Sequence, residues 1–242
     1  MTSTLKIDTI EPEGATTTLT VGESGQNTVI AGAGIKANVA KDAGGNAIFT
    51  SNGSGTISGL NSGFGSALTL ISTQAVTNQA SISFTSGIDS TYKEYIFYCI
   101  DINPATSSTE LQFQVNAVGE TGYNENFTAS FFGADHTENN TSAGLSFDTG
   151  RSLYDSTAFQ AITGGQSNDA DAVGAGELHL YNPASTTYVK NFWATFNSYN
   201  AAPETRNTFV AGYFNITAAI DDIQFKMSSG NFDGTIKMYG VK

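Results

Sequence analysis

Residues 92–102 read Tyr-Lys-Glu-Tyr-Ile-Phe-Tyr-Cys-Ile-Asp-Ile, and this stretch indicates the fold class. Its apolar residues occupy both parities of an extended chain, with Tyr95 and Phe97 at one and Ile96 and Tyr98 at the other. Side chains of a β-strand point alternately to opposite faces, so a strand that is apolar at both parities belongs in the middle of a fold. We therefore expect a central strand here.

Segments on either side repeat the extended pattern. Leu111-Gln112-Phe113-Gln114-Val115-Asn116-Ala117 alternates apolar and polar residues, which predicts one buried face and glutamines that face water. Residues 81–84, 177–180, 223–227 and 234–240 are also expected to be strands, with a further strand around 157–163, and no amphipathic helix emerges. About ten to twelve short strands predict an all-β fold, an antiparallel β-sandwich with a jelly-roll as the leading topology and a closed barrel as the alternative.

Aromatic residues divide the chain near residue 65. Residues 1–65 contain only Phe49 and Phe64, whereas the other 25 Phe, Tyr and Trp residues follow. Short apolar fragments cut by glycine, such as Thr28-Val29-Ile30-Ala31-Gly32, fill the first region. They fit either a flexible linker or short strands that bury their apolar faces only against other chains, and the Val and Ile residues favour strands. We therefore divide the chain into 1–65 and a β-sandwich head, 66–242.

The composition excludes several classes of protein. Charged residues make up only 13% of the chain and the net charge is −12, so the phosphate backbone of a nucleic acid would be repelled. No apolar run is long enough for a membrane-spanning helix, so we expect no membrane insertion. No hydrolase, nucleotide-binding or CxxC motif occurs. We expect a structural or binding protein rather than an enzyme, with no catalytic residues and no cofactor.

Three further residues are candidate metal ligands or nucleophiles. His136 lies between Asp135 and Glu138, which fits either a metal site or a solvated loop, and the loop is favoured. His179 stands between two leucines, which places it on the opposite face of its strand as a surface or intersubunit residue. Cys99 lies in the apolar strand and is expected to be buried. We therefore predict no metal site.

Aromatic residues beside Asn or Asp in loops are the candidates for ligand binding. A sugar has apolar faces as well as hydroxyl groups, so a ring next to an amide or carboxylate can bind it. The alternative is that each Tyr ends a strand with its ring in the core and its hydroxyl in water. The candidate receptor-binding residues are Tyr123, Asn124, Tyr154, Tyr199 and Asn200.

Two parts of the chain carry a family resemblance. Its elements are Ser3-Thr4-Leu5-Lys6-Ile7-Asp8-Thr9-Ile10, Thr18-Leu19-Thr20-Val21-Gly22, Tyr92-Lys93-Glu94-Tyr95, Leu180-Tyr181-Asn182-Pro183 and Gly234-Thr235-Ile236-Lys237-Met238-Tyr239-Gly240. With these elements, residues 3–22 and 80–242 resemble bacteriophage virion fibre proteins of the marine and cyanophage type, which end in a β-sandwich head domain. Residues 23–65 carry no such resemblance.

The resemblance implies a homotrimeric tail fibre or fibre knob on the surface of the phage particle, assembled in the host cytoplasm. Residues 1–22 would attach it to other virion proteins, with Leu5, Ile7 and Ile10 as attachment candidates. Residues 23–65 would form an intertwined trimeric β shaft, in which three chains pair strand edges that one chain leaves open. The head would recognise a host-surface glycan and mediate adsorption.

Two other functions remain open. A capsid or tail decoration protein could use the same fold to clamp neighbouring virion subunits. A glycan depolymerase would need a pair of suitably spaced carboxylates, and no paired-acid motif stands out in the sequence.

Overall fold

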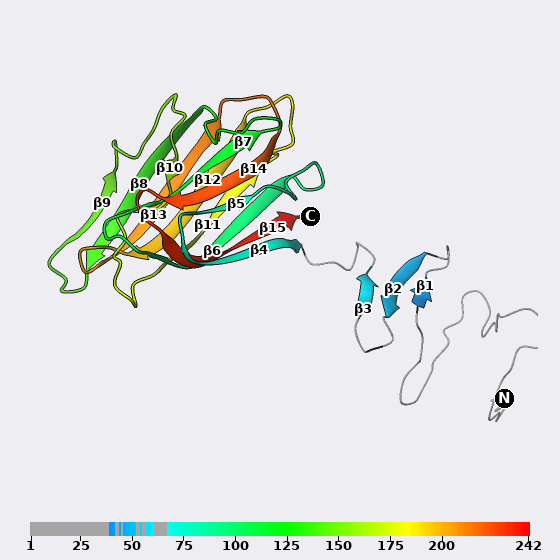
Figure 1. Ribbon diagram of the computed structural model, residues 1–242, viewed down its shortest axis with the longest axis horizontal. Helices are drawn as coiled ribbons and strands as arrows, with labels where there is room; N and C mark the ends of the chain where they lie inside the picture. Colours follow the sequence, from blue (N-terminus) through cyan, green and yellow to red (C-terminus); the bar gives the residue numbers. More distant parts are fainter. Residues whose placement is uncertain (1–38, 42–43, 45, 52–53, 55–56, 61–66) are drawn as a thin grey trace, which may run out of the picture. The chain divides into compact units, whose positions relative to one another are not determined.

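The computed structural model describes residues 39–41, 44, 46–51, 54, 57–60 and 67–242, and the chain divides into two compact units, Met1–Gly65 and Ser66–Lys242. In unit 1, three antiparallel strands form a sheet in the order β1 (Val39–Lys41), β2 (Ala47–Ser51), β3 (Ile57–Leu60) (Figure 1). The attachment segment with Leu5, Ile7 and Ile10, and residues 23–38 of the expected shaft, lie outside the described residues.

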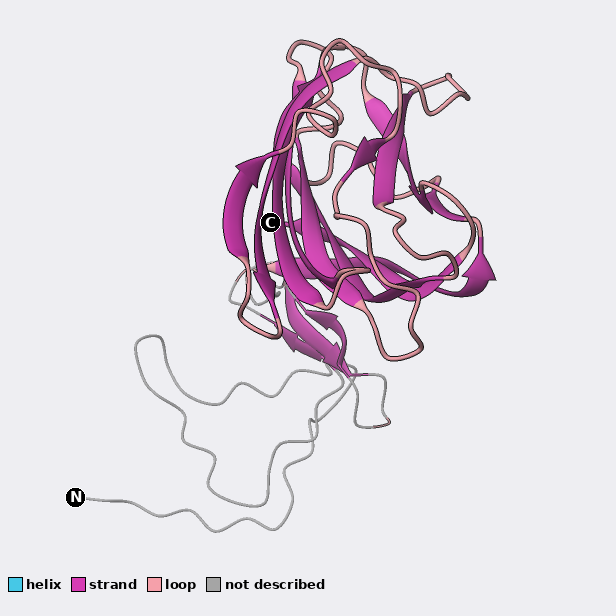
Figure 2. Cartoon of the chain, turned by 90° about the vertical axis from the view of Figure 1, so that its left-hand side faces the viewer, coloured by secondary structure: helices cyan, strands magenta, loops and turns pink. Residues whose placement is uncertain are grey.

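Unit 2 is built from two antiparallel sheets that pack face to face. The larger follows the order β4 (Leu68–Gln79), β15 (Phe232–Val241), β6 (Glu94–Pro104), β11 (Gly174–Tyr181), β12 (Lys190–Tyr199), β13 (Glu204–Phe214), β8 (Phe127–Thr137), β9 (Ala143–Phe147). The smaller follows the order β10 (Gln160–Ala161), β7 (Leu111–Ala117), β14 (Ile220–Met227), β5 (Ser81–Phe84). Figure 2 shows the long curved strands of the larger sheet on one side and the short strands opposite. The described residues form no helix, and the prediction of an all-β antiparallel fold is confirmed.

Phenylalanine rings from both sheets meet in the interior of unit 2. Phe113 of β7 packs edge-on against Phe192 of β12, with ring centroids 5.0 Å apart. Phe225 of β14 lies 5.5 Å from Phe97 of β6, and all four rings are buried. Burying a Phe side chain contributes about 1.5–3 kcal/mol. These rings therefore hold the smaller sheet against one face of the larger.

Strand β6 lies between β15 and β11, inside the larger sheet, as residues 92–102 predict. Tyr95 and Phe97 point into the core and have no exposed surface. Asp101 has a left-handed φ of 52° next to a shift in the strand register. This irregularity changes the parity of the strand, and Ile102 is therefore buried as well.

The other parity of β6 lies on the outer face of the larger sheet. Ile96 and Tyr98 share this face with Ile100, which is 36% exposed. Among the described residues, no second sheet covers it. The strand is thus central within its sheet, but within the described part of unit 2 the smaller sheet covers only one of its two apolar faces.

Two of the three polar residues of β7 do not face water, which corrects the prediction from 111–117. Gln114 and Asn116 are buried, with 0% and 3% exposure, because the loops after β7 and before β10 fold over this face. The Gln114 side chain donates to the carbonyls of Glu125 and Ala158 at 3.1 and 3.0 Å. A simple alternation cannot distinguish a solvated polar face from one that binds the backbone of a covering loop.

Two further elements differ from expectation. Strand β9 was not predicted, because Ala143-Gly144-Leu145-Ser146-Phe147 is short and contains a glycine. A strand was expected around 157–163, but only Gln160–Ala161 pairs with β7. The other residues of that segment run as loop.

We predict that Gln114→Ala lowers the free energy of unfolding by about 1–3 kcal/mol, because buried carbonyls lose their donor. Gln112→Ala is the matched control, since Gln112 lies on the same strand but is half-buried, and its effect should be within about 0.5 kcal/mol. Urea unfolding of both variants measures this. Equal effects would show that the loop does not depend on Gln114.

Candidate functional site on the outer face

Neighbouring strands place aromatic and acidic side chains together on the outer face of the larger sheet. His179 of β11 pairs with Ile96 of β6 on one side and with Trp193 of β12 on the other. Glu177, two residues earlier, pairs with Tyr98 in the same way. Residues two apart on a strand share a face, so these side chains form one patch. His179 lies on the face opposite its leucine neighbours, as predicted, but it is only 8% exposed, so the expected surface position is wrong.

The His179 ring is at the centre of this patch. It stacks on the Trp193 ring, with centroids 4.0 Å apart and planes 12° from parallel. Its Nδ1 atom lies 2.5 Å from the carboxylate of Glu94, and Trp193 Nε1 donates to the hydroxyl of Tyr181 at 2.6 Å. We call Glu94, Glu177, His179, Tyr181 and Trp193 the aromatic–acid cluster.

One polar atom of the cluster has no partner within hydrogen-bond distance. His179 is 8% exposed, and its Nε2 atom is buried without a hydrogen bond among the described residues. The Glu177 carboxylate lies 3.6 Å from this atom. Buried polar groups without a partner are rare in folded proteins, and they commonly mark a position that a ligand or water satisfies.

Tyr181 of the cluster and the neighbouring Tyr98 remain protonated hydrogen-bonding groups at neutral pH. Partial burial raises the pKa of the Tyr98 hydroxyl, and the charge of Glu177 adds to the effect. Partial burial also raises the pKa of Tyr181, whereas its bond from Trp193 acts in the opposite direction. The Tyr98 hydroxyl can therefore donate to a ligand, whereas the Tyr181 hydroxyl is engaged by Trp193 and Glu94.

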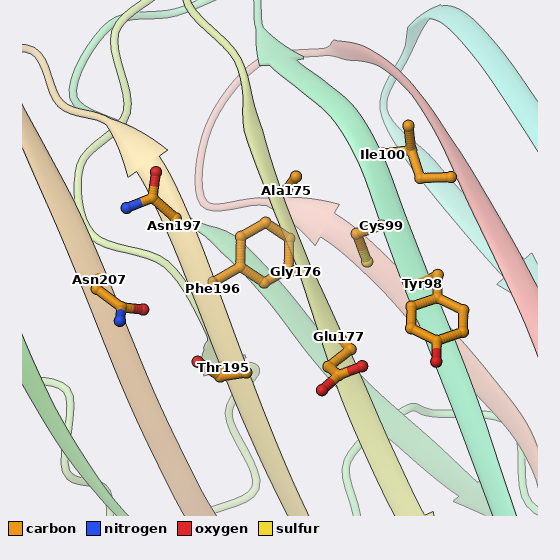
Figure 3. A pocket seen from close by; sticks show the side chains of 10 residues that line it. All are labelled: Tyr98, Cys99, Ile100, Ala175, Gly176, Glu177, Thr195, Phe196, Asn197 and Asn207. Atoms are coloured by element: carbon orange, nitrogen blue, oxygen red, sulfur yellow. The ribbon is translucent and has the colours of Figure 1, made fainter.

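A hollow of about 500 Å³ lies beside the cluster and spans four strands. Figure 3 shows Tyr98 on β6, Glu177 on β11, Thr195 on β12 and Asn207 on β13 around it. A Cβ atom on Gly176 would lie only 2.3 Å from the Thr195 carbonyl oxygen, so only glycine permits the close approach of β11 and β12 at this point.

A second hollow of about 500 Å³ lies on the opposite side of Trp193. Its lining includes Tyr181, Asn191 and Trp193, together with Tyr213 of β13. Ligand sites commonly have volumes of about 300–1,000 Å³, with apolar walls and a few polar groups. The cluster thus separates two recesses that each combine rings with hydrogen-bonding side chains.

The loop candidates from the sequence lie at two opposite ends of the larger sheet. Tyr123 and Asn124 precede β8, and their loop is joined to that of Tyr154 by a hydrogen bond from Asn126 to Asp155. Tyr199 lies beyond the other end of β8, where β12 pairs with β13. Strand β8 has 11 residues, so about 30 Å separate the two groups.

The candidate residues differ in what they present to solvent. Tyr154 is 82% exposed, Tyr199 is half-buried and Asn124 is exposed. Asn200 is 8% exposed and donates to Glu204 at 2.7 Å, so the expected exposed position is wrong for this residue. Tyr123 has a left-handed φ of 46°, which bulky residues seldom adopt.

The metal alternative at His136 gains no support. His136 Nε2 lies 2.9 Å from the amide oxygen of Asn140, within an exposed turn. Among the described residues no group of three or more His, Cys, Asp or Glu side chains is arranged to hold a metal ion. Cys99 is buried as expected, and burial raises the pKa of its thiol.

Loop-based reasoning missed the aromatic–acid cluster, although the sequence contains a signal for it. Residues 177–181 and 191–195 alternate core residues with Glu, His, Tyr and with Asn, Trp, Thr. Each segment alone resembles an ordinary strand with one buried face and one solvent-facing side. Only the pairing of β11 with both β6 and β12 brings His179, Trp193 and Glu94 together.

Comparisons with known proteins add no relative. The chain matches no protein family, no curated protein and no solved structure. In the part of the chain that the structure describes, no helix is long and apolar enough to cross a membrane. Any functional assignment therefore depends on the residues and geometry described above.

We predict that Tyr181→Phe destabilises the fold by about 1 kcal/mol and changes Trp193 fluorescence, because the indole N–H loses its acceptor. Tyr213→Phe is the control, since the Tyr213 hydroxyl lies on the same face without a hydrogen bond among the described residues. Trp193 is the single tryptophan, so its emission reports on this position alone. An unchanged emission in Tyr181→Phe would contradict the contact.

Proposed function

We propose that this protein is a homotrimeric phage appendage, a tail fibre or fibre knob, whose head binds a host-surface saccharide without catalysing a reaction. The observation that carries the proposal is the aromatic–acid cluster between two recesses on an uncovered sheet face. The resemblance of residues 3–22 and 80–242 to virion fibre proteins supports the setting on a phage particle.

The chemistry of the cluster suits a sugar ring. Trp193 and Tyr98 offer ring faces for the apolar C–H face of a pyranose. Glu94 and Glu177 are half-exposed and can accept hydrogen bonds from sugar hydroxyls, while Asn197 can donate. Few such contacts give weak affinity for one head, and three copies on one appendage would strengthen adsorption through avidity.

The same chemistry specifies which saccharides the head accepts. Glu94 and Glu177 both lie against His179, so carboxylates outnumber cations within the cluster. The net charge of −12 adds a repulsive field for any polyanion. The proposal is therefore a neutral or amino-sugar ligand rather than a sulfated or uronate-rich polymer.

The jelly-roll topology and the trimeric shaft belong to the same proposal. Consecutive strands β4 to β8 alternate between the two sheets, and β14 and β15 do so again, as in a jelly-roll. In unit 1, the three short strands β1, β2 and β3 make a sheet of small area. Isolated sheets of this size are marginal in water, and association of three chains would stabilise them.

Binding of the full-length protein to neutral and acidic bacterial surface polysaccharides tests the proposed function. We predict a saturable change of Trp193 emission with at least one neutral polysaccharide and none with sulfated dextran. Trp193→Ala and Glu177→Gln should each weaken binding by about tenfold or more, measured by a plate assay that does not use fluorescence.

Tyr188→Ala is the control for these variants, because Tyr188 is 68% exposed but lies in the loop between β11 and β12. Its affinity should equal that of the wild type. Equal affinity of Trp193→Ala would remove the cluster from the binding site. Release of reducing sugar ends during incubation would contradict a non-catalytic head.

A further inference from the structure

The outer face of strands β13, β8 and β9 differs in charge from the half that carries the aromatic–acid cluster. The register aligns Thr195 of β12 with Phe209, Phe132 and Phe147 in a single row across the sheet. Alternate residues on either side of this row complete the outer face: Thr205, Asn207, Ala211 and Tyr213 on β13, Thr128, Ser130, Ala134 and His136 on β8, Ala143 and Leu145 on β9. None of these residues is Asp, Glu, Lys or Arg.

Large apolar side chains are exposed at the outer edge of this half. Leu145 and Phe147 of β9 are 74% and 61% exposed, and Phe132 and Phe209 are 40% and 36% exposed. The last two rings stack, with centroids 5.1 Å apart and planes 13° from parallel. We call these four residues the β9 patch. Contiguous apolar surface of this kind in a folded protein marks an interaction site.

The edge of the sheet at the patch also lacks the usual protection. Strand β9 is the last strand in the order of the larger sheet, and all five of its residues are exposed. It contains no charged residue and no proline, which are the residues that discourage edge pairing. No described strand pairs with its free side, which therefore offers a strand edge together with apolar side chains.

The charge distribution identifies the partner as another copy of this chain. Each chain carries a net charge of −12, so two copies repel one another over most of their surfaces. The strand residues on the outer face of β13, β8 and β9 include no Asp, Glu, Lys or Arg, so two copies can approach here without direct charge repulsion. Interfaces between proteins are likewise depleted of charge and enriched in aromatic residues at their centre.

Other occupants fit these observations less well. A saccharide needs hydrogen-bonding groups, and the β9 patch consists of Leu and Phe side chains only. An anionic membrane surface would be repelled by the acidic chain. A protein surface that supplies both apolar side chains and backbone groups matches the patch and the open edge together.

We propose that the heads of neighbouring copies of this chain contact one another through the β9 patch and the free edge of β9. The inference rests on the proposed function only for the number of copies, which is three. It also assigns different tasks to the two halves of one sheet face. Contact at β9 covers the edge of the sheet. The aromatic–acid cluster on β6, β11 and β12, with the recesses that extend from it to Asn207 and Tyr213 of β13, remains accessible to a ligand.

Cysteine cross-linking of the full-length protein tests the contact. Leu145→Cys places a thiol in the β9 patch, and Leu70→Cys is the matched control, since Leu70 is also an exposed outer-face leucine but lies on β4 at the opposite edge. The native Cys99 is buried and gives no background. With a short bis-maleimide at micromolar protein, we expect about tenfold more cross-linked product from Leu145→Cys, because the contact holds the thiols at a high effective concentration.

Leu145→Lys and Leu70→Lys form a second matched pair, measured by the thermal stability and mass of the assembly. Leu145→Lys should lower the stability of the assembly, because a charge enters an apolar contact, and Leu70→Lys should not. Equal cross-linking in both Cys variants, or none in either, overturns the contact. A mass of three chains without selective cross-linking refutes the contact and retains the trimer. Selective cross-linking with any other mass supports the contact and refutes the trimer.

Discussion

The larger sheet of unit 2 has two faces, and the smaller sheet covers only one of them. The four short strands of the smaller sheet and their loops bury Phe97, Phe192 and the other inward rings. All four strands pack on this inner face. Among the described residues of unit 2, no second sheet lies on the outer face. Both the saccharide site and the contact between copies follow from this asymmetry.

The asymmetry explains why aromatic residues occur at both parities of several strands. Inward residues such as Tyr95 and Phe97 build the core, whereas Tyr98 and Trp193 lie on the open face. An aromatic ring left partly in water gains less from folding than a buried one, so core stability does not account for the outer set. Their arrangement into stacked and hydrogen-bonded groups, as between His179 and Trp193, fits a preorganised binding surface.

The sequence predicts the class of the fold well because strand periodicity is a local property. Strand β6 is central, β5 and β7 lie where their apolar residues indicate, and His179 points away from its leucine neighbours. The alternation at β7 wrongly predicts that Gln114 faces water. Its side chain instead binds the backbone of Glu125 and Ala158, which are 11 and 44 positions away in the sequence. Strand β9 was missed because its pairing with β8, rather than its composition, makes it a strand.

The binding surface was harder to predict for the same reason. Exposed loop tyrosines are visible in the sequence, and Tyr154 is indeed exposed. The aromatic–acid cluster instead needs three strands from different parts of the chain, since Glu94 and His179 are 85 residues apart. Registers between distant strands are set by the whole core, so no single segment contains them.

Hydroxyl-radical footprinting of the full-length protein, with and without a bound polysaccharide, is the most direct test. It shows whether the outer face of the larger sheet both contacts other copies and binds the ligand. The account predicts that Leu145 and Phe147 are protected in the assembled protein before any sugar is added, and that Trp193 and Tyr98 become protected only when it binds. Tyr154 and Tyr188, both highly exposed outside the sheet, provide the reference for full labelling. Labelling of Leu145 and Phe147 at the reference level, together with unchanged labelling of Trp193 on binding, would contradict it.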